Sequence, residues 1–203
     1  MGTPQSPLLD APRPSIDLYW IPLGAGGNGF VRGNGRVYEA CRARLEKRRP
    51  QALLHTALMV RTAAGRYVVE NAWPSPDADT ASRGVVVEGP VFSRRLARFR
   101  PFRYKVRRWR DGVIADAGAA LGGPRALSAD PILAERLLDL AASVPALIWG
   151  RDELRAGEMW NSNSVIAWLL ERTGLPTDEI PPPAGCRAPG CRAGIVAARL
   201  PAH

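Results

Sequence analysis

Two β-rich runs separated by a short turn constrain the fold of this chain more than any other feature. Ala52–Thr62 and Gly65–Ala72 are rich in β-branched and aromatic residues, as strands are. The connection between them is short and ends in glycine, which predicts an antiparallel hairpin. A third β-rich run, Arg83–Gly89, adds a further strand. The centre of the chain is therefore predicted to be a block of antiparallel strands.

Further elements are predicted on both sides of this block. The helices begin or end at recognisable signals, such as Asp130 before Pro131 at the start of one and Gly174 at the end of another. The resulting fold class is α+β, with a central antiparallel sheet packed by helices. We expect strands at Asp17–Gly24 and Ala193–Leu200, and helices at Arg36–Arg49, Ala129–Val144 and Glu158–Pro176.

Length and composition indicate one globular domain. The 203 residues are 46% hydrophobic and 23% charged, which is enough to build a sizeable core. Residues 1–15 are rich in proline and lack the apolar stretch of a signal peptide, so we expect a flexible tail followed by a single domain over 16–203. No apolar run approaches the 18 or so residues that span a bilayer, which predicts a cytoplasmic protein with no membrane partner.

The charge of +9 comes from 28 basic and 19 acidic residues, and all of the basic residues except Lys47 and Lys105 are arginines. That bias suggests a GC-rich bacterial genome and weakens the link between basicity and function. The run Ser93–Arg110 holds nine basic residues and alternates with apolar ones as a half-buried strand does. We expect an edge strand whose outward charges, Arg107 among them, prevent edge-to-edge pairing. The alternative is an acidic partner at Arg94–Arg110; nucleic acid is the less favoured partner.

Neither a metal site nor a cofactor site is predicted. Cys186 and Cys191 are separated by four residues, but the chain offers only two histidines to complete a zinc site. With Cys41 the count of cysteines is odd, which argues against a disulfide framework. The glycine-rich run Ala25–Gly35 joins a strand to a helix without the Gly-Lys-Ser/Thr ending that binds phosphate, and flexible turn is its expected role.

Four small polar residues, Asn161 to Ser164, begin the helix predicted at Glu158–Pro176. Apolar residues recur behind them at helical spacing, and this stripe places Ser162 on the buried face at the start of the helix. A helix N-terminus presents free N–H groups and a partial positive charge, where an enzyme can hold a nucleophile or an anion. The alternative is that all four residues serve only to cap the helix.

His55, the chain's only internal histidine, opens the first strand of the hairpin. A strand histidine followed about a hundred residues later by a polar helix start resembles the circularly permuted papain-like superfamily, in the branch of PPPDE peptidases and LRAT-like and NlpC-related acyl enzymes. The resemblance covers about residues 52–175. It implies that His55 is the base and that Ser162, in Asn-Ser-Asn-Ser-Val, occupies the position of the nucleophilic cysteine.

A serine in the cysteine position changes the chemistry that this resemblance implies. The field of a helix contributes about 1 kcal/mol, too little to ionise a hydroxyl, so Ser162 needs a positioned base. Glu70, on the adjoining strand of the hairpin, is the candidate to orient His55, and Glu88 is the second choice. Backbone N–H groups at the helix start, supported by Asn161 and Asn163, would form the oxyanion site.

Three functions follow from these features. The first is a hydrolase or acyltransferase that acts on an amide, thioester or ester bond of an unknown acyl or peptide substrate, with Ser162 as nucleophile and His55 as base. The second is an inactive relative that serves as a binding or scaffold module. The third is a nucleic-acid-binding protein that uses Arg94–Arg110. The first requires His55 and Ser162 to lie together at the edge of one cleft.

Overall fold

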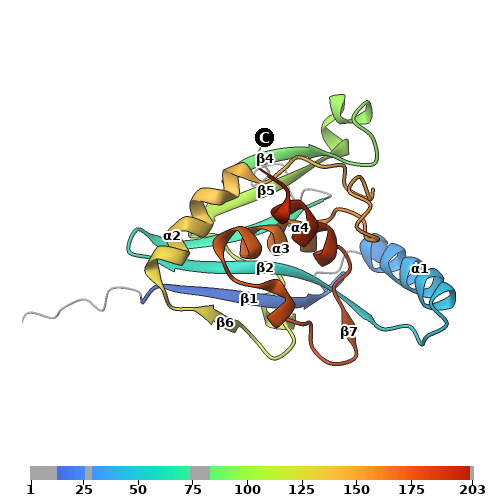
Figure 1. Ribbon diagram of the computed structural model, residues 1–203, viewed down its shortest axis with the longest axis horizontal. Coiled ribbons are helices and arrows are strands. Elements are labelled where there is room, and N and C mark those ends of the chain that lie inside the picture. Colours follow the sequence, from blue (N-terminus) through green and yellow to red (C-terminus); the bar gives the residue numbers. More distant parts are fainter. Residues whose placement is uncertain (1–12, 26–28, 74–82, 202–203) are drawn as a thin grey trace, which may run out of the picture.

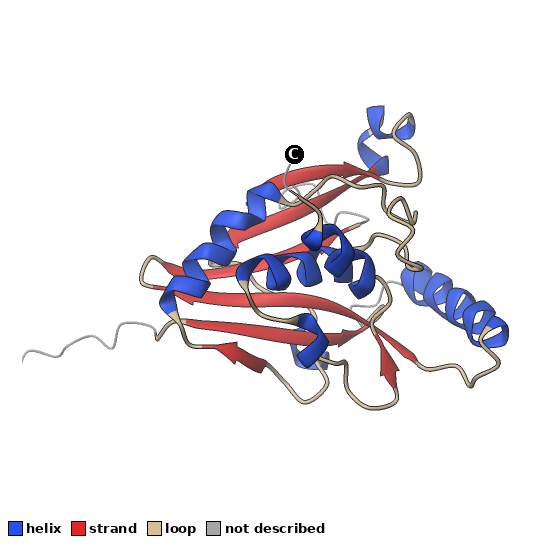
Figure 2. Cartoon of the chain, viewed as in Figure 1, coloured by secondary structure: helices blue, strands red, loops and turns tan. Residues whose placement is uncertain are grey.

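The structure is a computed structural model that describes residues 13–25, 29–73 and 83–201. The tail expected at 1–15 lies outside these residues as far as residue 12, and the first strand begins at Ser15. The elements of the described residues, drawn in Figures 1 and 2, comprise seven strands and four α-helices. The strands are β1 Ser15–Pro22, β2 Ala52–Thr62, β3 Gly65–Ala72, β4 Val85–Pro90, β5 Arg103–Arg110, β6 Arg125–Ser128 and β7 Cys186–Arg187. The helices are α1 Gly29–Leu45, α2 Pro131–Leu140, α3 Ser162–Thr173 and α4 Cys191–Arg199.

The strands form one sheet in the order β4-β5-β3-β2-β1-β6, and every neighbouring pair in this order is antiparallel. The short β7 pairs with the beginning of β2 in parallel. The hairpin of β2 and β3 has the bounds expected from the sequence. These observations confirm the α+β class and the central antiparallel sheet.

The helices α2, α3 and α4 cover one face of the sheet (Figure 1). Leu54, Leu58 and Val60 of β2 point toward this face and join the main hydrophobic core with α2 and α3. Successive side chains of a strand alternate between faces. Ala57 and Met59 accordingly belong to a smaller cluster on the second face.

The sequence explains where the helices on this face begin and end. Asp130 caps α2 by accepting a hydrogen bond from the backbone N–H of Ile132 at 2.8 Å. At the end of α3, Gly174 takes a left-handed conformation with φ of 98°, and Leu175 N–H donates back to the carbonyl of Leu170. Both ends match their predicted signals.

The sheet divides at one end between β2 and β3. Their pairing runs only from Leu58 opposite Val69 to the turn. Beyond that point β2 stays paired with β1 as far as Leu54, and β3 stays paired with β5 as far as Ala72. The sheet is thus continuous at the hairpin turn and separates into two halves at the other end.

Three elements differ from the sequence-based expectation. The glycine-rich run Ala25–Gly35, expected as a flexible turn, is helical from Gly29 onward, so the helix expected at Arg36–Arg49 is α1, Gly29–Leu45. The segment expected as a strand at Ala193–Leu200 is the helix α4, which packs closely against α3. The strand β5 is not an edge strand, because it lies between β3 and β4. Arg107, expected in solvent, is accordingly buried, with 2% of its surface exposed. For α4 and β5 the outcome depends on contacts between distant segments, which a local pattern does not contain.

Among the helices of the described ranges, none has the length and apolar character needed to cross a membrane.

Candidate functional site

Two of the four polar residues at the start of α3 form its cap. The Asn161 side-chain oxygen accepts hydrogen bonds from the backbone N–H groups of Asn163 at 2.9 Å and Ser164 at 3.4 Å. The Ser164 hydroxyl in turn accepts one from the backbone N–H of Asn161 at 3.0 Å. This reciprocal capping box satisfies the free backbone donors of the first turn.

Asn163 ties the helix to the sheet. Its side-chain oxygen accepts a hydrogen bond from the Thr56 hydroxyl at 3.0 Å, and its amide nitrogen donates to the carbonyl of Leu54 at 2.9 Å. The same nitrogen donates to the carbonyl of Pro189, also at 2.9 Å. The buried Asn163 therefore connects β2, α3 and the loop before α4, and its side-chain amide forms hydrogen bonds through both its oxygen and its nitrogen.

The start of α3 is also fixed to the start of α4. The Ser164 hydroxyl donates to the carbonyl of Gly190 at 2.8 Å, and the Asn161 amide donates to the carbonyl of Pro189 at 2.9 Å. Gly190 has φ of 101°, and a Cβ there would overlap the Asn161 side chain. Asn161 and Asn163, expected to support an oxyanion, thus use their side chains to hold the helix start in place.

Ser162 is the remaining residue of the four, and its hydroxyl forms no hydrogen bond with the described residues. It is 9% exposed. Its backbone N–H also has no acceptor among those residues, whereas the next two N–H groups are taken by the cap. The hydroxyl is not among the fully buried polar atoms without a partner, so it remains accessible from the cavity.

Ser162 lines a cavity of about 220 Å³ at the end of the sheet where β2 and β3 have separated. The wall includes Leu54 and His55 from β2 and the first residues of α3. The structure thus brings His55 and Ser162 to one cavity, although 107 residues (162 − 55) separate them in the chain. The aromatic residues of the wall are Tyr38, Trp73, Phe92 and Trp149.

The environment of His55 differs from that of Ser162. Because Leu54 and Thr56 point toward α3, strand alternation places the His55 side chain toward the second face. No hydrogen bond joins it to Ser162 or to any other described residue. Burial lowers the pKa of His55 below its ordinary value of 6.5, and the Asp116 carboxylate acts in the opposite direction. The imidazole is therefore neutral near pH 7, the state in which it can accept a proton.

Asp116 was not singled out from the sequence. It lies in the connection after β5, where Ile114 and Ala117 pack against the cluster on the second face. That cluster contains Ile21, the register partner of His55 on β1, and Ala57, the next residue of β2 on that face. No sequence motif marks Asp116, since its place depends on which connection covers the second face.

Glu70 does not take the role expected for it. Its carboxylate accepts a hydrogen bond from the Arg107 guanidinium at 3.2 Å. Burial raises the pKa of Glu70, and the charge of Arg107 opposes that rise. Glu88, the second choice, pairs with Arg103 at 3.2 Å. Neither carboxylate forms a hydrogen bond with His55 in the structure.

The cysteines provide no alternative nucleophile in the cavity. Cys191 begins α4 but lines a separate cavity of about 10 Å³. Burial, aided by the Glu158 carboxylate, raises the pKa of its thiol to about 12, so it is not a thiolate. Cys41 and Cys186 are free thiols. Within residues 13–25, 29–73 and 83–201, no three His, Cys, Asp or Glu residues gather as they would to hold a metal ion.

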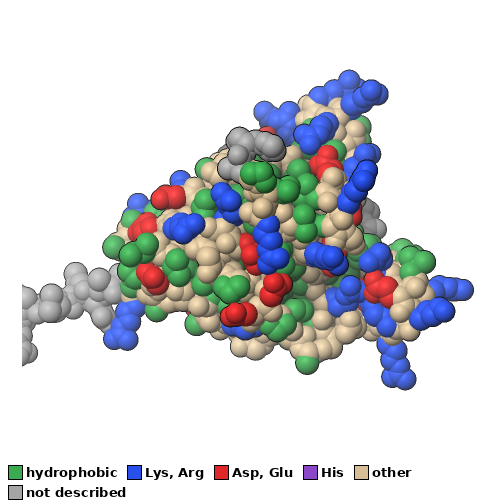
Figure 3. Space-filling model, in the orientation of Figure 1, with side chains coloured by type: hydrophobic (Ala, Val, Ile, Leu, Met, Phe, Trp, Pro, Cys, Tyr) green, Lys and Arg blue, Asp and Glu red, His purple; other side chains and the backbone are tan. Residues whose placement is uncertain are grey.

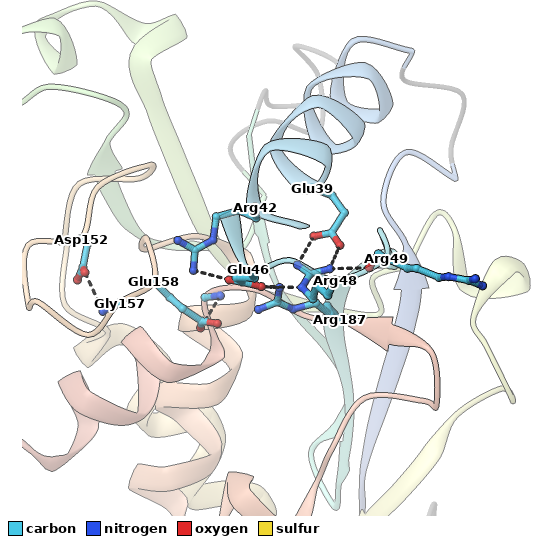
Figure 4. Close-up of polar contacts among 10 residues, drawn as sticks. Glu39, Arg42, Glu46, Arg48, Arg49, Asp152, Gly157, Glu158 and Arg187 are labelled. Carbon is cyan, nitrogen blue, oxygen red and sulfur yellow. Dashed lines mark hydrogen bonds and ion pairs between the residues drawn. The ribbon is translucent and has the colours of Figure 1, made fainter. Parts of the chain in front are cut away.

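Tyr38 of α1 belongs to the cavity wall. Ion pairs around the end of α1 connect this helix to neighbouring segments (Figure 4). Glu46, at the end of this helix, contacts Arg42 at 2.9 Å and Arg187 of β7 at 2.8 Å. Arg48 connects Glu39 and Glu46. Glu158 accepts hydrogen bonds from the N–H groups at the start of α4. The cavity is thus bordered by fixed elements.

The first part of the basic segment forms two short turns, Leu96–Arg98 and Arg100–Phe102, that project beyond β4 and β5 (Figure 1), and the rest is β5 itself. Arginine and lysine side chains gather over this projection in Figure 3. Its ion pairs include Arg94 with Glu153 at 3.3 Å. The exposed positive surface is therefore smaller than the expected Arg94–Arg110, because Arg107 of β5 is buried.

No protein-family model matches the chain, and no curated protein or solved structure matches it.

Proposed function

We propose that the protein is a hydrolase or acyltransferase that acts on an amide, thioester or ester bond, with Ser162 as its nucleophile. One observation carries the proposal: of the four polar residues that begin α3, Ser162 alone forms no hydrogen bond with the described residues, and it lines a cavity. Ser162 is not among the fully buried polar atoms without a partner, so its hydroxyl is open to the cavity and available to a ligand at the start of a helix.

In the proposed reaction the Ser162 hydroxyl attacks the carbonyl carbon of the substrate while His55 accepts its proton. The negative charge that develops on the carbonyl oxygen is stabilised by the unused backbone N–H of Ser162 and the field of α3. His55 then gives the proton to the leaving group, and an ester with Ser162 remains. Water or another acceptor attacks this ester, again with His55 as base.

His55 and Asp116 have separate roles in this mechanism. Burial keeps the imidazole neutral and able to accept a proton, as the lowered pKa of His55 reflects. The carboxylate of Asp116 favours the imidazolium while the ring lies on the second face. In the ring position of this structure, Asp116 is the carboxylate that acts on His55, whereas Glu70 was the one suggested by the sequence. The chain order, a strand histidine before a helix-start nucleophile, is the one that the papain-like resemblance implies.

The mechanism requires a rearrangement of His55, because no hydrogen bond joins it to Ser162 in this ligand-free structure. Catalytic hydrogen bonds are often long or poorly aligned until substrate binds. The separation of β2 from β3 beside His55 leaves this part of β2 without a paired neighbour on one side. Turning the His55 side chain toward the cavity changes the backbone of β2 at a residue that is paired with Ile21 of β1 but not with β3.

A second function is favoured by the strand alternation that directs His55 toward the second face. If the ring stays there, Ser162 lacks a base, and the cavity binds a ligand without chemistry. The same fold is then a binding module.

Labelling with a fluorophosphonate probe, which reacts with activated serines, tests the first function. We expect covalent labelling of the wild type, loss of labelling in Ser162→Ala, and a decrease of about 100-fold or more in the labelling rate in His55→Gln. Ser143→Ala is the matched control, because this serine is exposed and lies outside the cavity. Labelling that persists in Ser162→Ala, or its absence from the folded wild type, contradicts the proposal.

A further inference from the structure

The cavity has an aromatic wall with a defined geometry. The rings of Trp73 and Phe92 are 5.5 Å apart and nearly perpendicular, at 85°. The rings of Trp73 and Trp149 are 6.2 Å apart at 53°. Aromatic rings attract one another in such edge-to-face arrangements because the ring faces are negative and the edges positive.

The rings of this wall are held from behind. The indole N–H of Trp73 donates to the carbonyl of Pro101 at 2.8 Å. Trp149 packs on Tyr104 at 5.7 Å, and the Tyr104 hydroxyl donates to the carbonyl of Leu147 at 2.9 Å. A wall fixed in this way does not have to be ordered when a ligand binds, which favours affinity.

Phe92 has a strained backbone conformation. Its φ is 60°, a left-handed conformation that residues other than glycine seldom adopt, and the residue is 48% exposed. The backbone is held there by a hydrogen bond from Phe92 N–H to the carbonyl of Trp149 at 3.0 Å. Gly150 lies beneath the ring, where a Cβ would stand 3.3 Å from it. Strain of this kind gathers at ligand sites.

The cavity also limits the charge and size of its ligand. Of the described residues in its wall, His55 alone is ionisable near neutral pH, and its imidazole is neutral there. No Asp, Glu, Lys or Arg of the described residues lines the wall, which favours a neutral ligand group over a charged one. The volume of about 220 Å³ exceeds the roughly 150 Å³ of an apolar cavity that binds benzene. One aromatic ring with a short link to a carbonyl fits this space, while a long acyl chain would extend outside it.

We propose that the cavity binds an uncharged aryl group, which makes the substrate an aryl-substituted acyl compound. The assignment of this group as the acyl part rests on the proposed function, whereas ring binding does not. The ring would pack against Trp73 and Phe92, and its carbonyl would point toward Ser162. The ring contacts favour an aryl group over a saturated ring of the same size by about 2- to 10-fold in affinity.

Binding to Ser162→Ala protein separates this inference from the reaction. Phenylacetamide, cyclohexylacetamide and decanamide serve as neutral probes, and quenching of tryptophan fluorescence with calorimetry gives their affinities. We expect the tightest binding for phenylacetamide, and loss of its advantage in Phe92→Leu and Trp73→Leu. Phe99→Leu is the matched control, since this phenylalanine is also about half exposed but lies outside the cavity wall.

Each result bears on one statement. Equal affinities for the aryl and cyclohexyl probes, tighter binding of decanamide, or no binding of phenylacetamide at millimolar concentration would overturn the inference. So would an unchanged aryl preference in both Phe92→Leu and Trp73→Leu. If the aryl probe binds but the fluorophosphonate probe does not label the wild type, the aryl site is supported and the proposed hydrolase or acyltransferase function is contradicted.

Discussion

The four polar residues at the start of α3 have different roles: three make structural contacts, and one is available for chemistry. Asn161 and Ser164 form the cap, Asn163 braces the helix to β2, and Ser162 is left facing the cavity. The sequence pattern offered capping and chemistry as alternatives for the whole group. The structure instead assigns a structural contact to each of three residues, and this separation could not be derived from local spacing, because the partners of Asn163 lie on β2 and before α4.

The titration of His55 should depend on Asp116. The carboxylate favours the imidazolium, so Asp116→Asn should lower the pKa of His55 further below 6.5. NMR suits the measurement because the chain has only two histidines, and His55→Gln assigns their signals. Asp111→Asn, on an exposed side chain of the same connection, should leave the pKa unchanged. An unchanged pKa of His55 in Asp116→Asn would refute the role given to Asp116.

The same lowered pKa sets the direction of the pH dependence. Unfolded protein takes up a proton on His55 as the pH falls through about 6.5, whereas the folded protein does so only at lower pH. The contribution of His55 to stability is therefore present above this window and decreases as the pH falls through it. Labelling of Ser162 should decrease with falling pH as His55 takes up its proton, and in Asp116→Asn this decrease should move to lower pH.

At the level of elements, local signals predicted the hairpin and the helix ends but not the packing partners. The bounds of β2 and β3 follow from composition and a short turn, both of which are local. The segment at α4 has a short apolar run, Ile195–Val196, that suits a strand or a helix equally. Its helical state is accompanied by a close approach of Gly194 to α3, and a single sequence does not display that contact.

Gly194→Ala should destabilise the protein, although alanine is the better helix former. Its Cβ would overlap the carbonyl oxygen of Ser164 and stand 2.9 Å from the Ala167 Cβ, which forces α3 and α4 apart at a cost of about 1–3 kcal/mol. Gly33→Ala in α1 is the matched control, because its Cβ meets nothing within 4 Å and should stabilise by up to about 1 kcal/mol. Thermal unfolding compares the two, and the same sign for both would contradict the packing argument.

At the level of the whole molecule, the fold class was predictable and the site was predictable in part. A central block of strands with helices before and after it indicates α+β without knowledge of strand order. The sequence brought His55 and Ser162 together only through a resemblance. The order that places β5 inside the sheet, and the connection that carries Asp116 to the second face, arise from contacts between segments far apart in the chain.

The divided sheet should be visible in amide hydrogen exchange. Amides of residues 58–62 lie where β2 is paired on both sides, whereas from Ala57 back to Leu54 it is paired with β1 alone. Amides of residues 54–57 that point away from β1 should therefore exchange faster than their neighbours in 58–62, since local opening there breaks fewer contacts. Residue-resolved exchange by NMR measures this, and uniform protection along β2 would contradict a sheet that separates.

A sheet fastened at one end and open at the other behaves as a pair of jaws with the cavity between them. Leu54 and His55 belong to one jaw and Trp73 follows the strand of the other, so an occupant touches both. A ligand that binds there stabilises the arrangement in which the two jaws are held together. The stabilisation is about 2.7 kcal/mol when the ligand concentration is a hundred times its dissociation constant. By the same linkage, a distant change that moves the jaws apart lowers the affinity for the ligand.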